Sequence, residues 1–278
     1  MEEINEFNKK ISELKSSLDI ATPLKIVVIN VCAVVSSRLD LQTLYDNRHL
    51  RDTWSFKYKP LDKKNVSSEI IVKTKTKTTK IKKDKSESTF YNCIIIDFKY
   101  NNLNISCKVF PNGKLQITGL KTISDAHEIP VLLFNFIKDV KQTNIYLKDQ
   151  KIGMINSNFL FNKTINQELL KNIINDKYKY NGTDGFFRIA TFNPEQFPGI
   201  NIKFWTEATR LRYKKYFNND LNIKHKKIPT SKIDGQISIF IFRTGKVTIT
   251  AAKTTNELAE AYLCITSLVY KHKEVLIN

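Results

Sequence analysis

Strict alternation of apolar and polar residues predicts β-strands with one buried face in two separate parts of the chain. Successive side chains of a strand point to opposite faces, so each alternating segment has one apolar and one polar set. The apolar sets, which we expect to face a core, are Leu103, Ile105, Cys107, Val109, Leu115 and Ile117, and later Ile237, Ile239, Ile241, Val247 and Ile249.

A helical period follows each alternating region. Apolar residues spaced three and four apart predict long helices over 124–140 and 256–272, which we expect to lie on the apolar faces of the strands. Their predicted buried residues are Ile129, Leu132, Leu133, Phe136 and Val140 in the first helix, and Leu258, Tyr262, Ile265, Leu268 and Val269 in the second.

The two regions contain copies of one hairpin. FPNGKLQITGLKT starts at Phe110 and FRTGKVTITAAKT starts at Phe242, and seven of their thirteen positions are identical. Gly113 and Gly245 fall at the turns, where a positive φ is expected. Each hairpin is preceded by an apolar strand containing VINV (28–31) or MINS (154–157) and then by a helical stretch, 36–47 or 162–174. Each half therefore reads strand, helix, several strands, helix, which predicts an α+β fold built from an internal repeat.

The polar face of the hairpins is the informative one. It carries hydroxyls, amides, lysine and phenylalanine, whereas a solvated face would normally mix Glu with Lys. From these strands we expect a face without carboxylates, which suits contact with a nucleic acid. Its residues are Ser106, Lys108, Phe110, Gln116 and Thr118 in the first half, and Ser238, Phe240, Phe242, Thr248 and Thr250 in the second.

Charge supports a polyanionic partner. The 278 residues include 45 Lys and Arg against 27 Asp and Glu, a net charge of +18. Nucleic acid is the first candidate partner and an anionic membrane surface the second, although a compositional bias of the genome would also raise the lysine content. No apolar run approaches the roughly 18 residues of a membrane helix, so we expect no membrane insertion. Residues 1–22 are charged and amphipathic, which predicts an N-terminal helical extension and not a signal peptide.

Residues for catalysis or metal binding are not grouped. Cys32, Cys93, Cys107 and Cys264 form no C-x-x-C pair and stand apart from the four histidines, so we expect buried thiols, no metal and no cofactor. The absence of a disulfide framework favours an intracellular, reducing compartment. No phosphate-binding loop or hydrolase motif occurs, and we expect a protein that is not an enzyme.

These segments resemble the TATA-box-binding protein family, most closely its divergent relatives in large nucleocytoplasmic DNA viruses. Both hairpins match the family's F-x-x-G-K-x-x-x-T-G-A-K pattern, NPEQFPGINIKF (193–204) matches its P-x-x-F-P-G segment, and RLDLQT (38–43) matches the entry to its first helix. The resemblance covers about residues 24–275. It implies a saddle, in which two pseudo-symmetric repeats form one curved antiparallel sheet with helices on the convex face.

The resemblance also implies a DNA-binding role for the concave face. In the family this face lies in the minor groove of AT-rich duplex, and phenylalanines at both ends wedge between base steps and kink the DNA. Matching positions here make Phe110, Phe242 and Phe197 wedges and Thr118 and Thr250 groove contacts. The full set expected to contact DNA is Val28, Asn30, Lys108, Phe110, Lys114, Gln116, Thr118, Asn156, Phe197, Phe240, Phe242, Lys246, Thr248 and Thr250.

Several positions depart from the family pattern. The order of asparagine and apolar residue in the first strand of each half is reversed, with Asn30 after Val28 and Asn156 after Met154, but both asparagines keep the side facing the groove. Lys108, Gln116 and Thr248 replace apolar contacts, which makes the face wetter. The second wedge of the first half has no clear counterpart. Phe90 is one substitute, and a strand-edge or core aromatic is the other interpretation of that residue.

Two basic insertions extend the family core. We divide the chain into the extension 1–22, repeat one at 23–144 with an insertion at 72–88, and repeat two at 145–278 with an insertion at 207–232. Both insertions could reach phosphates beside the groove, and a solvated loop or a protein-docking surface is the alternative for each.

The sequence therefore predicts a transcription initiation factor that binds an AT-rich promoter, bends it and helps recruit RNA polymerase with a transcription factor B-like protein. We expect a monomer located in a cytoplasmic virus factory or the nucleus, with packaging in the virion as a further option. An architectural or non-specific nucleic-acid binder and a protein-interaction module of a viral transcription complex remain as alternatives.

Overall fold

The computed structural model describes residues 20–58, 92–141, 144–181, 185–214 and 235–277. The first part of the chain forms β1 (Lys25–Val35), α2 (Leu41–Asp46), η1 (Arg48–Arg51), β2 (Ser55–Lys57), β3 (Ile94–Tyr100), β4 (Leu103–Val109), β5 (Lys114–Leu120) and α3 (Ile123–Lys141). The second part forms β6 (Leu147–Leu160), α4 (Gln167–Ile173), η2 (Ile174–Tyr178), β7 (Phe187–Asn193), β8 (Phe197–Trp205), α5 (Glu207–Tyr213), β9 (Gln236–Phe242), β10 (Lys246–Ala252), α6 (Thr255–Lys271) and α7 (Lys273–Leu276). The predicted N-terminal helix, Phe90, the whole first insertion and most of the second lie outside these ranges.

The strands are hydrogen-bonded in the order β2-β3-β4-β5-β1-β6-β10-β9-β8-β7. Every pairing with a described register is antiparallel. Outward from the middle, the order on one side is β1, β5, β4, β3, β2, and on the other side it is β6, β10, β9, β8, β7. In each half the first strand lies in the middle, and the four later strands follow it from the last to the earliest. The fold class predicted from the sequence, α+β with an antiparallel sheet made by two similar halves, is confirmed. The chain separates into two compact units, one of residues 31–120 and 124–151 and the other of 1–30, 121–123 and 152–278.

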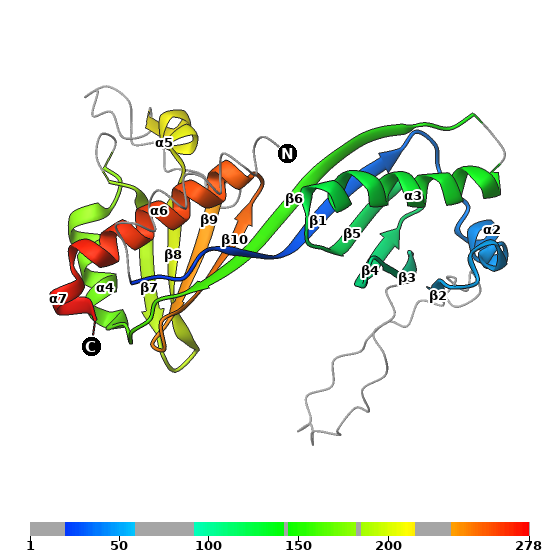
Figure 1. The fold of residues 1–278 in the computed structure, drawn as a ribbon. Coiled ribbons are helices and arrows are strands. Elements are labelled where there is room, and N and C mark those ends of the chain that lie inside the picture. The colour runs from blue at the N-terminus through cyan, green and yellow to red at the C-terminus, as the bar shows by residue number, and fades with distance from the viewer. Residues whose placement is uncertain (1–19, 59–91, 142–143, 182–184, 215–234, 278) are drawn as a thin grey trace, which may run out of the picture. The chain divides into compact units, whose positions relative to one another are not determined.

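One long helix covers the strands of each unit, α3 over β4 and β5 and α6 over β8, β9 and β10 (Figure 1). The predicted strand core is confirmed, since all of its members are buried except Leu103, which is half-buried. All five predicted residues of α6 are buried as well. In α3 the prediction is correct for Ile129, Leu133 and Phe136, while Leu132 and Val140 are half-buried and Ile137 is buried in addition.

Each hairpin turn is closed by the end of the first strand of its own half. The amide of Val35 donates to the Gly113 carbonyl at 2.9 Å, and the amide of Phe161 donates to the Gly245 carbonyl at 2.9 Å. Both glycines have the expected positive φ, 81° and 82°. A Cβ at either position would lie within 2.6 Å of backbone oxygens of that first strand segment, so the close approach excludes any side chain. The same turn geometry thus occurs at both copies of the hairpin.

A second left-handed position ends each hairpin. Gly119 has φ of 99°, and the corresponding residue of the second copy, Ala251, has φ of 71°. Ala251 lies at the irregularity where the pairing of β10 with β6 shifts between Ile249 and Ala252. The second hairpin therefore keeps a backbone conformation that suits glycine but fills it with a residue for which it is strained.

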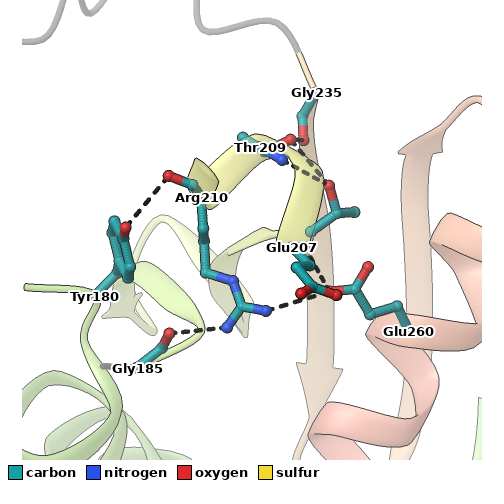
Figure 2. A network of polar contacts seen from close by, with 8 residues as sticks. Tyr180, Gly185, Glu207, Thr209, Arg210, Gly235 and Glu260 are labelled. Atoms are coloured by element: carbon teal, nitrogen blue, oxygen red, sulfur yellow. Dashed lines mark hydrogen bonds and ion pairs between the residues drawn. The ribbon is translucent and has the colours of Figure 1, made fainter. Parts of the chain in front are cut away.

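The second basic insertion begins as α5, which is fastened to α6. The Glu207 amide donates to Glu260 Oε1 at 2.7 Å, and Arg210 Nη2 lies 3.6 Å from the same oxygen (Figure 2). Arg210 Nη1 also donates to the Gly185 carbonyl at 3.0 Å, and its guanidinium lies 4.6 Å from the centre of the Phe186 ring. Burial raises the pKa of Glu260, and the Glu207 amide and the Arg210 charge oppose that rise.

The described chain that follows this insertion is bonded to α5. Thr209 Oγ1 donates to the Gly235 carbonyl at 3.1 Å (Figure 2). Tyr213 is buried and stacks on Trp205 with ring centroids 5.2 Å apart. Tyr213, which lies within this insertion, is therefore part of the core.

We predict that Ala251→Gly stabilises the protein, because glycine removes the left-handed strain of alanine. The expected gain in the free energy of unfolding is about 0.5–1 kcal/mol. This is the backbone strain that glycine relieves, minus the stability lost because glycine gives the unfolded chain more conformational entropy. Urea unfolding measures it. Ala33→Gly, at an ordinary strand position, should lose stability and serves as control. A similar loss for both variants would contradict the prediction.

We predict that Arg210→Met lowers the free energy of unfolding by about 1–2 kcal/mol at about pH 8, because Glu260 loses its cation. The loss should shrink towards about pH 5. The pKa of Glu260 is already raised and would rise further without Arg210, so protonation removes the unpaired charge as the pH falls. Denaturant unfolding at both pH values tests this. Arg243→Met, at an exposed turn position, should have little effect, and a loss independent of pH would contradict the role of Glu260.

Candidate nucleic-acid interface

Opposite the buried core set, the strands present a second set of side chains, which we call the open face. Residues directly opposite each other in antiparallel strands share a face, and the registers define this set. It comprises Ile95, Asp97, Ser106, Lys108, Phe110, Lys114, Gln116 and Thr118 in repeat one, and Phe197, Gly199, Asn201, Lys203, Ser238, Phe240, Phe242, Lys246, Thr248 and Thr250 in repeat two. Val28, Asn30, Met154 and Asn156 likewise alternate with buried neighbours on β1 and β6.

Three phenylalanines cluster on the open face of repeat two. The ring of Phe197 lies 5.6 Å from that of Phe240 and 5.6 Å from that of Phe242, in edge-to-face contacts. Phe197 is 40% exposed even with these two ring contacts. Three predicted site residues from two distant segments are thus brought together.

Gly199 makes room for this cluster. It lies opposite Phe242 in the register of β8 and β9. A Cβ at this position would lie 2.7 Å from Cε1 of Phe197 and 3.1 Å from Cε1 of Phe242. The glycine of the P-x-x-F-P-G segment therefore allows both rings to pack directly against the backbone of β8. Its role is to leave space for the rings, since its φ is not in the left-handed region.

Repeat one has a different arrangement. Phe110 is half-buried at the corresponding end of β4, but Lys108 occupies the position that corresponds to Phe240. Lys108 lies opposite Ile95 on β3 and Gln116 on β5. On the open face of β3, β4 and β5, the described residues include no aromatic besides Phe110. Phe90, considered as a second wedge, lies outside the described residues.

Two predicted asparagines carry unpaired acceptors. The side-chain oxygens of Asn30, Asn156 and Asn201 are buried and accept no hydrogen bond in the described structure. A buried polar atom without a partner destabilises a protein by about 1–3 kcal/mol, so such atoms are frequent where a ligand supplies the partner. Asn201 was not among the residues predicted from the sequence, and its position opposite Phe240 reveals it.

Polar residues fill the rest of the open face. Thr118 and Gln116 are exposed, and Thr248 and Thr250 are half-exposed. Lys114 and Lys246, which begin β5 and β10, are both exposed beside the turns. These predicted residues are positioned to contact a ligand lying on the strands, and their contact with DNA stays a prediction.

The expected absence of carboxylates fails beyond the hairpins. Asp97 on β3 lies directly opposite Ser106, whose hydroxyl donates to Asp97 Oδ1 at 2.6 Å. Lys57 Nζ lies 3.3 Å from Asp97 Oδ2. The pattern of the hairpin strands could not show this carboxylate, because pairing with β3 is needed to place it on the open face.

Lys203 on β8 was also missed. Its ammonium donates to Ser238 Oγ at 2.7 Å. Burial lowers the pKa of Lys203, and the neighbouring charge of Arg188 lowers it further. Lys203 belongs to the P-x-x-F-P-G segment that was recognised in the sequence, so counting by two from Gly199 would have placed it on the open face.

Other chemistry is sparse in the described ranges. They contain no group of three or more His, Cys, Asp or Glu side chains able to hold a metal ion. Cys93 and Cys107 are buried as expected, Cys32 and Cys264 are half-buried, and burial raises the pKa of Cys264 to about 12. Among helices with described residues, none combines the length and apolarity needed to cross a membrane.

Comparison with known proteins gives a curated viral relative. No family model matches the chain. The TATA-box-binding protein-like protein of Acanthamoeba polyphaga mimivirus is 29% identical over 214 residues, which cover 69% of this chain and 51% of the relative. The chain thus spans about half the length of that relative. Among solved structures, Methanococcus jannaschii TBP aligns with a TM-score of 0.48 and 15% identity, over 90% of this chain and 99% of that one.

The sequence similarity to the viral relative agrees with the two hairpins and the P-x-x-F-P-G segment from which the resemblance was inferred. The strands and helices of the structure agree with the α+β fold that the resemblance implies. The chain is therefore similar to the TATA-box-binding protein-like protein of mimivirus.

Proposed function

We propose that the open face binds double-stranded DNA in the minor groove of an AT-rich promoter and bends it, without enzymatic activity. The observation that carries the proposal is the partly exposed cluster of Phe197, Phe240 and Phe242 on a face that otherwise holds amides, hydroxyls and lysines. Exposed rings that pack edge to face have apolar edges available for insertion between base pairs.

The polar groups of the open face suit the chemistry of an AT groove. A·T pairs display only acceptors in the minor groove, whereas G·C adds the donor amine of guanine. The amides of Asn30 and Asn156 offer donors to those acceptors, and the hydroxyls of Thr118 and Thr250 can donate as well. The buried side-chain oxygens of both asparagines accept no hydrogen bond in the described structure, and a bound water would have to supply that donor because A·T pairs display only acceptors in the minor groove.

Positive charge would supply the sequence-independent part of the affinity. The chain carries a net charge of +18, and Lys114 and Lys246 are exposed beside the two Phe110 and Phe242 turns. Each phosphate neutralised by such a lysine releases counterions, which makes binding weaken as salt rises.

The biological role that follows is transcription initiation. The curated relative is a viral protein described as TATA-box-binding protein-like. By analogy we propose that the bent promoter is recognised by a transcription factor B-like protein and RNA polymerase, that the chain acts as a monomer, and that it works inside the infected cell, in a cytoplasmic virus factory or the nucleus.

A binder with little sequence preference is the second candidate. Lys108, Gln116 and Thr248 make the open face more polar than an apolar wedge surface requires. A polar face can accommodate the guanine amine, so it would discriminate weakly between A·T and G·C pairs. Most of its affinity would then come from phosphate contacts, and binding would depend steeply on salt.

We predict that Phe110→Ala/Phe242→Ala binds an AT-rich duplex at least about tenfold more weakly than the wild type, because the loss of base stacking removes about 1–3 kcal/mol for each ring. The salt dependence should stay unchanged, since no phosphate contact is lost. Fluorescence anisotropy with AT-rich and GC-rich duplexes over a salt series measures both quantities.

Tyr270→Ala is the matched control, because Tyr270 is an aromatic residue of α6 with the same 40% exposure as Phe197. It should bind like the wild type. If both duplexes bind equally well and the phenylalanine substitutions do not change the affinity, minor-groove wedging is contradicted. The binder with little sequence preference would then be the better explanation. No binding by the wild type would leave a protein-interaction module.

A further inference from the structure

A hollow of about 470 Å³ lies on the helix side of the strands in repeat two, between α5, α6 and η2. Phe204 of β8 forms part of its lining and lies opposite Ile237, a residue of the buried core set. The hollow is therefore on the other side of the strands from the open face. Its volume is typical of sites that take a small ligand or the anchoring side chain of a partner.

One face of α6 forms the longest wall of this hollow. The residues that line it recur at a spacing of three and four, which places them on one side of the helix for three turns. They are Glu260, Leu263, Cys264, Ser267, Leu268 and Lys271. At the rise of an α-helix this wall is roughly 16 Å long, which is enough for about five residues of an extended peptide.

The facing wall is formed by α5, the start of the second insertion. Arg210 reaches from α5 to the Gly185 carbonyl on one side and to Glu260 on the other (Figure 2). Its guanidinium also lies over the ring of Phe186, which stays 40% exposed at the edge of the hollow. The insertion thus builds a site that the repeated hairpins and the P-x-x-F-P-G segment do not supply.

The two ends of the hollow differ in charge. At the α5 end, Glu207 and Glu260 accompany Arg210, which pairs with Glu260 at 3.6 Å. At the other end, Lys271 is exposed and its ammonium lies 5.6 Å from the centre of the Tyr178 ring. A ligand that lies along α6 would therefore meet an acidic end and a basic end.

A second cation strengthens the basic end. Burial lowers the pKa of His272, and the charges of Lys177 and Lys271 lower it further, so the three groups lie close together. Asp176 and Glu274 are neighbours in the sequence, but in the described part of the chain neither lysine has a carboxylate at ion-pair distance. Two neighbouring cations without a paired acid favour an anionic group of a ligand beside them.

We propose that this hollow is a docking site for a short segment of a partner protein, in which one apolar side chain has an acidic residue beside it. The apolar side chain would pack on Leu263 and Leu268, and the carboxylate would pair with Lys271. Burial of the anchor supplies most of the affinity, and the charge pair selects acidic segments. The inference goes beyond the proposed function and does not depend on it, because no residue of the open face takes part.

The test is a selection on the full chain from a phage-displayed library of random 12-residue peptides. Peptides are selected on the wild type and then depleted on Ser267→Trp. Ser267 is exposed on the α6 wall, so a tryptophan there would fill the hollow without entering the core. We expect the surviving peptides to share an apolar residue flanked by Asp or Glu.

The surviving peptides are then synthesised with a fluorophore, and anisotropy measures their affinity. We expect binding to Ser267→Trp to be at least about tenfold weaker, because the anchor loses its pocket. Lys271→Glu should weaken binding by about threefold or more, since one exposed charge is reversed. Asn135→Trp and Lys138→Glu make the same kinds of change at exposed positions of α3 and should bind the peptides like the wild type.

If no peptide survives the depletion, the docking site is overturned. Survivors with basic or uncharged flanks, or an unchanged affinity for Lys271→Glu, would overturn the acidic chemistry of the partner. Binding of the AT-rich duplex by Ser267→Trp is measured in parallel and should equal that of the wild type, which also shows that the variant is folded. Failure of the wild type to bind DNA would concern the proposed function alone, so the two proposals can fail separately.

Discussion

The apolar contact between a long helix and one face of its strands is the interaction on which each half of this protein depends. Ile129, Leu133 and Phe136 of α3 are fully buried, as are the core residues of β4 and β5. Burying a side chain of this size contributes about 1.5–3 kcal/mol, so the contact between helix and strands is strongly stabilising. Because strand side chains alternate, this burial commits every other residue to the open face. The open face is then free to carry polar and exposed aromatic residues that contribute little to folding.

The hairpin clamp adds a second constraint, which acts on the backbone. In both copies the turn glycine bonds to the end of the first strand and leaves no room for a Cβ. The clamp fixes where the phenylalanine before the turn lies, since Gly113 and Gly245 also donate to the Phe110 and Phe242 carbonyls at 3.0 and 2.9 Å. The backbone position of this phenylalanine is therefore set by hydrogen bonds and steric exclusion at the turn.

Similar halves need not have similar chemistry. The backbone devices recur, but the open-face residues differ where Asp97 faces Ser106 and Lys203 faces Ser238. Polar substitutions on such a face have a small effect on folding because the core lies on the other side. Similar halves can thus differ in charge on this face while the fold stays the same. The insertion that begins with α5 is attached on the helix side of the strands and not on the open face, since Arg210 pairs with Glu260 of α6.

The sequence by itself determined the fold class, the two hairpins and most of the buried positions of the hairpin strands and of the two long helices, because period-two and helical patterns depend only on neighbours along one chain. It also placed Phe197 and Phe242 in the site through the hairpin and P-x-x-F-P-G motifs. Only the tertiary structure decided that these rings meet Phe240 over Gly199, that Asn201 and Lys203 join them, and that Asp97 interrupts the face. Those facts depend on register between strands far apart in sequence, and register is fixed by long-range hydrogen bonds and core packing that no local pattern specifies.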